Sequence, residues 1–241
     1  MIHDASLLRR GVQWLSQVPW AFNSLRWILE GGYRRHRRLL ASHFHRPPAR
    51  VLDCGCGTGI YSPCFSPQSY IGIDISPTYI AHARAHHPNY HFEVMDATGL
   101  AFADNSFEAV IVCGVVHHLD EATTHRVLAE LARVLQPDGR LLLWEDVPTR
   151  GKLNLLGHLV HRLDVGCHIR SGDEYAQLLE PHFKIESSEF LRSGFMDYIA
   201  FKARKPVEQL GTERLASDHS PGCASDARVS QSGLLENPEP A

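Results

Sequence analysis

The feature that most constrains this chain is a glycine-rich segment that follows a short apolar run. Residues 51–59 read Val-Leu-Asp-Cys-Gly-Cys-Gly-Thr-Gly. This pattern is typical of a buried strand that ends in an acidic residue, followed by a tight turn and a helix from Ile60. Glycine in such a turn lets the backbone approach a nucleotide-like ligand closely. The segment therefore predicts an α/β fold that binds a ligand at the carboxyl end of a strand.

The spacing of the glycines separates two classes of ligand. A dinucleotide fingerprint reads G-x-G-x-x-G and places a pyrophosphate at a helix N-terminus. Here Gly55, Gly57 and Gly59 give G-x-G-x-G after Asp53. That pattern suits a ligand without phosphate that carries a carboxylate, an ammonium and a nucleoside, and S-adenosylmethionine (SAM) is such a ligand. The alternative is a tight strand–helix turn that binds nothing, because lone motifs give false matches.

Apolar runs alternate with helical stretches over residues 49–205, and a composition that is 44% hydrophobic allows one sizeable α/β domain. Five runs are nearly continuous in apolar character, as strands covered on both faces should be. They lie at 51–53, 70–74, 91–96, 109–113 and 140–145. Alternation of this kind predicts a parallel sheet with right-handed crossovers. Two adjacent strands, at 183–191 and 196–205 around a Ser193-Gly194 turn, predict an antiparallel hairpin on the sheet edge.

Helix and turn signals lie between these strands. Ser76 is an N-cap followed by Pro77 at the first helical position, and Pro88 closes that helix. The other signals are an apolar helical face at 121–135, a turn at 137–139 and a capping box at 171–174 that begins a helix to about residue 180.

Three segments flank or interrupt the alternation. Residues 1–48 predict a helical N-terminal cap, which Pro19 splits into two helices and which breaks again at Gly31-Gly32 before a basic helix from Tyr33 to Phe44. Residues 146–172 predict a lid-like insertion with a helix near 152–163. Residues 206–241 predict a disordered tail, because they have too few apolar groups to offset the entropy of ordering.

Charge leaves two hypotheses for the cap. The net charge of the chain is −3, so nothing global indicates a nucleic-acid partner. Five arginines and no acidic residue lie between Gly31 and Arg46, downstream of Trp14, Trp20 and Trp27. The cap is therefore either a lid packed over the ligand pocket or a docking surface for a membrane or a lipid-like substrate.

The cysteines and the apolar segments indicate where in the cell the protein is expected. The chain has six cysteines and no apolar segment of the signal-peptide kind at its start. Disulfides are therefore not expected, and the cytoplasm is the expected location, with peripheral membrane contact through the cap as the further hypothesis. No apolar run reaches the ~18–20 residues of a membrane span.

Acidic residues end two more of the expected strands. Asp74 ends the second strand and can accept hydrogen bonds from two ribose hydroxyls. Asp96 ends the third and can accept from an exocyclic amino group, while the backbone N–H of Ala97 can donate to a ring nitrogen. Together with Asp53 these acids converge on the crevice where open α/β sheets bind ligands.

The chain resembles the class I SAM-dependent methyltransferases of the broad "type 11" group. The motifs that carry the resemblance lie at 51–59, 70–76, 96–110 and 130–141, and they are specific for the family but not for a substrate. The resemblance implies a Rossmann-like, seven-stranded, mostly parallel sheet with an antiparallel terminal hairpin and helices on both faces. It also implies that Asp53 and the glycine backbone hold the methionine end, Asp74 the ribose, and Asp96 with Ala97 the adenine. The expected cofactor-binding residues are Asp53, Gly55, Cys56, Gly57, Gly59, Asp74, Ile75, Asp96, Ala97 and Cys113.

Two adjacent histidines follow the fourth expected strand. His117 and His118 are the catalytic candidates, as a base or as a substrate contact, because this position lies beside the transferring methyl group in the family's fold. The alternative is that they complete the pocket wall. The loop lacks the Asn/Asp-Pro-Pro-Tyr/Phe motif of adenine and glutamine amino-methylating enzymes and the Pro-Cys motif of cytosine C5 enzymes.

Four residues of the insertion resemble a metal-ligand set, namely His158, His161, Cys167 and His168. The chain has 16 histidines in all, so we expect a surface helix and a loop here and no metal site.

The sequence therefore predicts a SAM-dependent methyltransferase that acts on oxygen, carbon or nitrogen of a small acceptor, hydrophobic or lipid-like. The expected partner is that acceptor, and no nucleic acid is expected. The alternatives are a SAM-binding regulatory or scaffold protein without turnover, and a methyltransferase of RNA or protein. The acceptor and the oligomeric state do not follow from the sequence.

Overall fold

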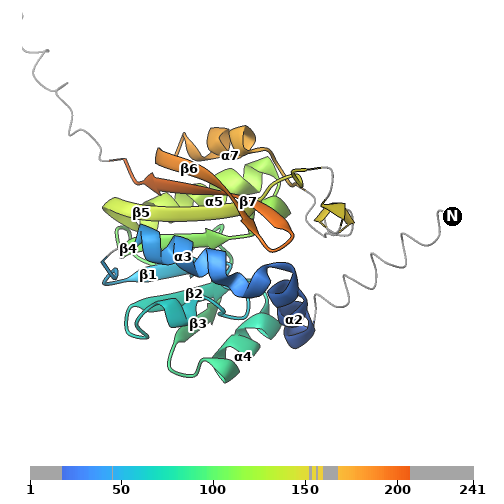
Figure 1. Ribbon diagram of the computed structural model, residues 1–241. Coiled ribbons are helices and arrows are strands. Elements are labelled where there is room, and N and C mark those ends of the chain that lie inside the picture. The colour runs from blue at the N-terminus through green and yellow to red at the C-terminus, as the bar shows by residue number, and fades with distance from the viewer. Residues whose placement is uncertain (1–17, 45, 152–153, 156, 160–167, 207–241) are drawn as a thin grey trace, which may run out of the picture. The chain divides into compact units, whose positions relative to one another are not determined.

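A computed structural model describes residues 18–44, 46–151, 154–155, 157–159 and 168–206 (Figure 1). It contains a seven-stranded sheet of order β3-β2-β1-β4-β5-β7-β6. The strands are β1 (Val51–Cys54), β2 (Tyr70–Asp74), β3 (His91–Val94), β4 (Phe107–Cys113), β5 (Leu135–Asp146), β6 (Lys184–Ser193) and β7 (Met196–Arg204). Strands β1 to β5 pair in parallel, whereas β7 pairs antiparallel with both β5 and β6. The predicted fold class and terminal hairpin are confirmed.

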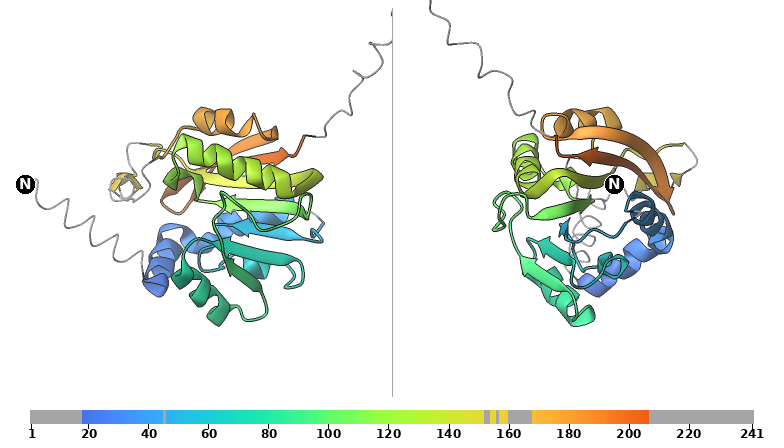
Figure 2. Two further views of the ribbon diagram at one scale, coloured as in Figure 1. Left: turned by 180° about the vertical axis from the view of Figure 1, so that it is seen from behind. Right: turned by 90° about the vertical axis from the view of Figure 1, so that its left-hand side faces the viewer.

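Helices cover both faces of this sheet (Figure 2). The described helices are α2 (Pro19–Leu29), α3 (Arg34–His43), α4 (Pro77–His86), α5 (Glu121–Val134) and α7 (Gly172–Leu179), with short 3₁₀ turns η1 (Gly31–Tyr33), η2 (Ser62–Cys64) and η3 (Val116–His118). Apolar residues of α3 and α4 pack on one face, and those of α5 and α7 pack on the other. None of the helices in the described part of the chain is long and apolar enough to cross a membrane.

Local sequence signals account for most helix ends. The side chain of Ser76 accepts a hydrogen bond from the N–H of Tyr79 at the start of α4. Ser171 and Glu174 form the predicted reciprocal capping box of α7. Gly32 has φ +72° in η1, which separates α2 from the basic helix α3 as the glycine pair predicts.

Two local predictions are wrong. No α-helix begins at Ile60; turns and the three-residue 3₁₀ element η2 follow the glycine segment instead. Pro63 explains this, because it restricts the preceding residue and removes a backbone donor. The Pro137–Gly139 turn lies inside β5, where Asp138 has φ +58° and the pairing with β4 shifts register, so the chain bulges without leaving the sheet.

The structure tests several other predictions only in part. Strand β3 ends at Val94, two residues before Asp96. In the insertion, residues 155 and 157–159 are helical, and the rest of the expected 152–163 helix lies largely outside the described residues. Residues 1–17 and 207–241 also lie outside them, so the domain boundaries and the disordered tail stay predictions.

Candidate active site

The glycine turn is fastened to the neighbouring strand by Asp74. One carboxylate oxygen of Asp74 accepts from the N–H of Gly57 at 2.9 Å, and the other accepts from the N–H of Ser76 at 2.8 Å. Burial raises the pKa of Asp74, and these two hydrogen bonds oppose the rise. The acid that ends β2 therefore shapes the turn that follows β1.

The three glycines of the turn have different roles. A Cβ at Gly55 would lie 2.3 Å from Cγ2 of Val115, and a Cβ at Gly59 would lie 2.7 Å from Cζ of Phe92. These two glycines are required by packing as well as by their positive φ angles. At Gly57 a Cβ would meet nothing within 4 Å. The turn thus presents bare backbone to open space at Gly57, which is the form of a cradle for a ligand.

Asp53 is a buried acid with one unused oxygen. Its Oδ2 accepts from the hydroxyl of Tyr70 at 2.6 Å, while Oδ1 is buried and has no hydrogen-bond partner. Burial raises the pKa of Asp53 to about 7, against the lowering effect of the Tyr70 hydrogen bond. An ammonium beside Oδ1 would satisfy that oxygen, so these residues fit the amino-acid end of SAM.

The third acid lies in a more open setting. Asp96 is exposed, and its Oδ1 accepts from both the N–H and the hydroxyl of Thr98 at 2.8 Å. These hydrogen bonds lower the pKa of Asp96. Ile75 is 70% exposed directly after Asp74, and Ala97 packs partly against the core. Asp53 lies within β1, Asp74 ends β2 and Asp96 comes two residues after β3, and of the three only Asp53 is fully buried.

Sequence reasoning missed the residue that organises the loop after β4. Glu145, fully buried near the end of β5, accepts from the N–H groups of Val115 at 2.9 Å and Val116 at 2.8 Å. Its other oxygen accepts from the N–H of His117 at 3.3 Å and lies 2.8 Å from Nδ1 of His117. The available signal was an acid at the end of the fifth strand, the same signal that marked Asp53 and Asp74.

This arrangement distinguishes the two catalytic candidates. A carboxylate next to Nδ1 holds a neutral imidazole in the tautomer whose basic nitrogen is Nε2. His117 is so held and is 4% exposed, and its Cε1 lies 3.5 Å from where a Cβ on Gly114 would be. His118 is exposed, with its ring centroid 4.0 Å from that of His117. His117 is therefore the better placed of the two for proton transfer.

A second group of polar and aromatic residues, most of them buried, lies at α2 and α3. We call it the cap cluster, and its members are Arg26, Glu30, Tyr33, His36, Tyr61, Cys113, Trp144 and Tyr198. Arg26 forms an ion pair with Glu30, and the Tyr61 hydroxyl lies 2.7 Å from Nδ1 of His36. The thiol of Cys113 donates to the Tyr61 hydroxyl at 3.5 Å, and burial raises the pKa of that thiol. Cys113, expected at the cofactor, thus also belongs to this cluster.

Burial sets the protonation of the cap cluster. It lowers the pKa of His36 to about 3, so the imidazole is neutral. Nε2 of His36 is buried without a hydrogen-bond partner, as is the hydroxyl of Tyr33. Unpaired buried polar atoms are costly, and they concentrate where a ligand or water completes the bonding.

Helix α2 is fixed directly to the glycine turn. The hydroxyl of Thr58 donates to the side-chain oxygen of Asn23 at 2.7 Å, and Thr58 is 5% exposed. At the other end of α2, the Ser193 hydroxyl donates to the carbonyl of Glu30 at 2.7 Å. Helix α2 therefore closes over the predicted ligand-binding end of the sheet.

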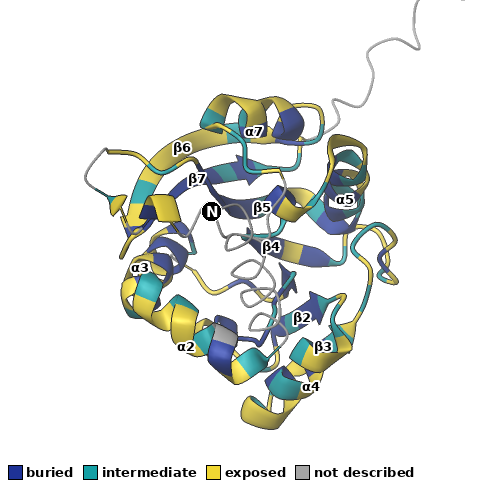
Figure 3. Cartoon of the chain, turned by 90° about the vertical axis from the view of Figure 1, so that its right-hand side faces the viewer, coloured by how far each residue is buried: buried dark blue, intermediate teal, exposed yellow. Residues whose placement is uncertain are grey.

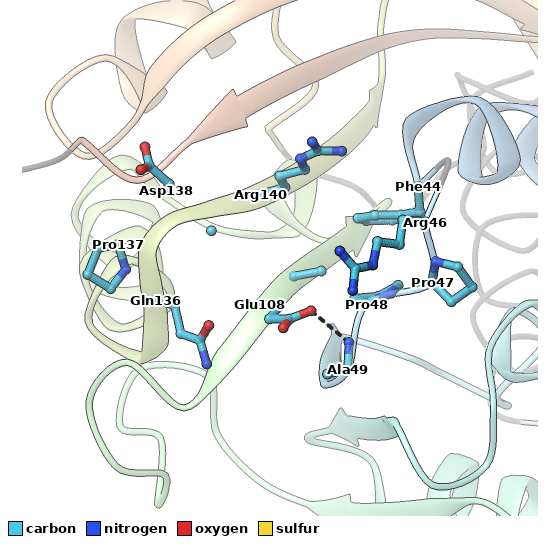
Figure 4. Close-up of a pocket in the computed structure, with 12 residues that line it drawn as sticks. Phe44, Arg46, Pro47, Pro48, Ala49, Glu108, Gln136, Pro137, Asp138 and Arg140 are labelled. Atoms are coloured by element: carbon cyan, nitrogen blue, oxygen red, sulfur yellow. Dashed lines mark hydrogen bonds between the residues drawn. The ribbon is translucent and has the colours of Figure 1, made fainter.

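A cavity of about 360 Å³ lies at the opposite end of the sheet. Figure 4 shows it between the segment before β1 and the start of β5, with Glu108 accepting from the N–H of Ala49. None of the expected cofactor or catalytic residues lines it. It therefore adds nothing to the site at the carboxyl ends of the strands.

The described residues contain no group of three or more histidine, cysteine or acidic side chains that could hold a metal ion. His161 and Cys167 lie outside those residues, so the metal set of the insertion is not tested.

Comparison with known proteins agrees with this geometry. Residues 51–139 match the model of a family described as a methyltransferase domain. A demethylmenaquinone methyltransferase of Renibacterium salmoninarum is 35% identical over 118 residues, which cover 48% of this chain and 49% of that protein. A probable tRNA methyltransferase 9B of Mus musculus is 37% identical over 102 residues, covering 41% of this chain and 22% of that protein.

The fold has solved counterparts. The N-methyltransferase NodS of Bradyrhizobium japonicum, crystallised with S-adenosyl-L-homocysteine, superposes with a TM-score of 0.59 at 17% identity, covering 73% of this chain and 88% of that one. The chain spans about half the length, or less, of the two curated relatives named above.

Proposed function

We propose that the chain is a class I SAM-dependent methyltransferase, with SAM as its cofactor, and that it methylates a small apolar acceptor beneath α2 and α3. The observation that carries the proposal is the Thr58–Asn23 hydrogen bond, which fixes helix α2 to the glycine turn. An acceptor must then reach the reacting end of the site beside the aromatic side chains of the cap cluster. The relative that acts on demethylmenaquinone supports an acceptor of this kind.

Each residue of the site has a defined task in this proposal. The backbone at Gly57, Oδ1 of Asp53 and the carboxylate of Asp74 would hold SAM, which supplies an activated methyl group on a sulfonium. Fixed orientation of the acceptor can contribute roughly 7–11 kcal/mol to lowering the barrier. His117, positioned by Glu145, would accept the proton of an oxygen or carbon acceptor through Nε2.

The cofactor assignment has a direct test. Asp74→Ala should weaken SAM binding by roughly 2–4 kcal/mol, because charge-assisted hydrogen bonds to the ribose are lost and the turn loses its anchor. Titration calorimetry measures this. Asp173→Ala removes an exposed acid of α7 and serves as the matched control. Equal SAM affinity in a folded Asp74 variant and in the control would refute the assignment.

The role of His117 has a kinetic test. His117→Asn should lower kcat by ~10²–10⁴-fold, the usual contribution of a general base, and leave SAM affinity unchanged. The acceptor for this assay comes from a screen of small-molecule extracts with labelled SAM. Loss of SAM binding instead of turnover would show that His117 only supports the pocket wall.

A macromolecular acceptor is the second candidate, because the tRNA methyltransferase relative is as similar in sequence as the quinone enzyme. Total tRNA in the same labelled assay decides between them. Label in tRNA and none in small molecules would overturn the small-acceptor proposal. SAM binding without S-adenosylhomocysteine from any acceptor would point to a protein without turnover.

A further inference from the structure

Helix α2 carries large apolar side chains on its outer face. Trp20, Trp27 and Ile28 are exposed by 69%, 60% and 62%. Positions seven and eight apart share one side of a helix, so these three form a single stripe. Single exposed apolar residues are ordinary, but a contiguous group of them marks an interaction surface.

Two neighbouring segments extend the stripe. Phe195, in the turn between β6 and β7, is 43% exposed, and its N–H donates to the carbonyl of Leu29 at 2.8 Å. The side chain of Asn154 donates to the carbonyl of Phe195 at 2.8 Å and brings Leu155 and Leu159 to the same end, exposed by 76% and 52%. Figure 1 shows α2, this turn and residues 155 and 157–159 around one end of the sheet. We call these six exposed side chains the apolar patch.

Positive charge lies on α3, which follows α2 directly after η1. Arg34, Arg35, Arg37 and Arg38 of α3 are all exposed. Figure 3 shows the exposed side of this helix in yellow. The only acid of α2, η1 and α3, counting the residue that joins them, is Glu30, which is 2% exposed and paired with Arg26. The solvent-facing side of these helices therefore carries cations and no anion, whereas the whole chain has a net charge of −3.

We propose that the apolar patch and the four arginines of α3 together form a docking surface for an anionic lipid bilayer. Tryptophan is suited to such an interface, because one part of its ring system is apolar and its N–H is polar. Arginine beside exposed apolar groups is the charge pattern that anionic headgroups attract. The apolar side chains of this surface match the interior of a bilayer, and its positive charge is opposite in sign to that of anionic headgroups.

Docking has a consequence for the acceptor, which rests on the proposed function. The Thr58–Asn23 hydrogen bond places α2 against the glycine turn, so the docked face adjoins the site. The acceptor would then be a lipid-soluble molecule that enters from the bilayer. The docking itself needs no turnover and can be measured without any acceptor.

The test uses the full chain with two kinds of vesicle, one of phosphatidylcholine and one in which about a third of the lipid is phosphatidylglycerol. We expect flotation with the anionic vesicles at low salt and release at high salt, because the screening length falls from ~10 Å at 0.1 M to ~3 Å at 1 M.

Paired variants separate docking from unfolding. W20S/W27S should reduce binding at least tenfold, whereas F190S should not, because Phe190 is also exposed, by 52%, but lies beside Gly172 of α7 on the other face of the sheet. R35Q/R38Q should reduce binding roughly 25-fold, since each cation near an anionic surface contributes about fivefold. R35K/R38K keeps both charges and should bind like the unaltered chain.

Three results would overturn the proposal. One is no flotation with anionic vesicles at low salt. Another is flotation that W20S/W27S leaves unchanged. The last is a dimer that W20S/W27S converts to a monomer without vesicle binding, which would assign the patch to a second copy of this chain. SAM binding, measured by calorimetry on the same variants, reports separately on the proposed function.

Discussion

The two faces of the sheet differ in what they bury. The hydrophobic core under α5 and α7 consists almost entirely of Leu, Val, Ile and Phe. The face under α2, α3 and α4 contains Tyr33, Tyr61, Tyr70, Tyr198 and Trp144 among its core residues. Glu30 and His36 are also buried at the α2–α3 end. The hydrophobic core is thus mainly aliphatic on one side of the sheet, and on the other side it is rich in aromatic residues that lie beside buried polar groups.

This difference indicates that the α2–α3 end contributes less to the free energy of unfolding than an apolar core would. Tyr33, His36 and Trp144 each have a buried polar atom without a hydrogen-bond partner. Such atoms cost free energy that a Leu or Val side chain in the same place would not. We infer that the α5–α7 face stabilises the domain and that the α2–α3 face is kept polar for binding. The following three predictions challenge this comparison, from the largest expected effect to the smallest.

The largest effect concerns His36 and acid. Burial lowers its pKa from 6.5 to about 3, so its contribution to stability is present above pH 6.5 and is lost as the pH falls from 6.5 to 3. This shift corresponds to at most about 5 kcal/mol. His36→Phe should reduce the dependence of the unfolding free energy on pH between pH 3 and pH 6.5, as measured by urea denaturation. His86→Phe, at an exposed position of α4, is the control, and equal profiles for the two variants would contradict the prediction.

The second effect has the opposite sign. Burial raises the pKa of Asp53 from 3.8 to about 7, so its contribution is present below pH 3.8 and is lost as the pH rises to about 7. The loss is at most about 4 kcal/mol. Asp53→Asn should remove this decline, so the variant should gain stability relative to the unaltered protein between pH 4 and pH 7. Urea titrations at several pH values measure it, with Asp173→Asn as control.

The third prediction compares the faces directly. Leu131→Ala removes a fully buried side chain of α5 and should cost roughly 2–5 kcal/mol of unfolding free energy without changing SAM affinity. Tyr61→Phe, on the other face, should cost about 1 kcal/mol, because it removes one hydroxyl from a hydrogen-bonded chain. It should alter turnover more than stability. Larger destabilisation by Tyr61→Phe than by Leu131→Ala would reverse the roles assigned to the two faces.

Much of the fold was predictable because its signals are local. The apolar strands, the Ser76 cap and the Ser171–Glu174 capping box each depend on residues close together in the sequence. The helix expected from Ile60 failed because Pro63 outweighs the general strand–turn–helix pattern. The turn at Pro137–Gly139 became a bulge, since pairing with β4 continues on both sides of it.

The site was predicted in part for the same reason. The glycine turn and the acids Asp53, Asp74 and Asp96 could be recognised because they lie at or near the carboxyl ends of strands. Glu145 was not recognised, although it too lies near the end of a strand, because its partners Val115 and His117 lie about 30 residues earlier. The cap cluster joins residues from α2, η1, α3, β4, β5 and β7, together with Glu30 and Tyr61 from connecting segments. No spacing in the sequence predicts this grouping.

The sequence by itself determined the class of fold and the geometry of the glycine turn, because strand periodicity, capping and glycine geometry act over a few residues. Only the tertiary structure decided which histidine is held by Glu145, that His36 is buried and neutral, and that Trp20 and Trp27 face outward. Burial and long-range pairing control these outcomes. Both depend on how segments that are distant in the sequence pack against one another, and this packing cannot be inferred from local sequence patterns.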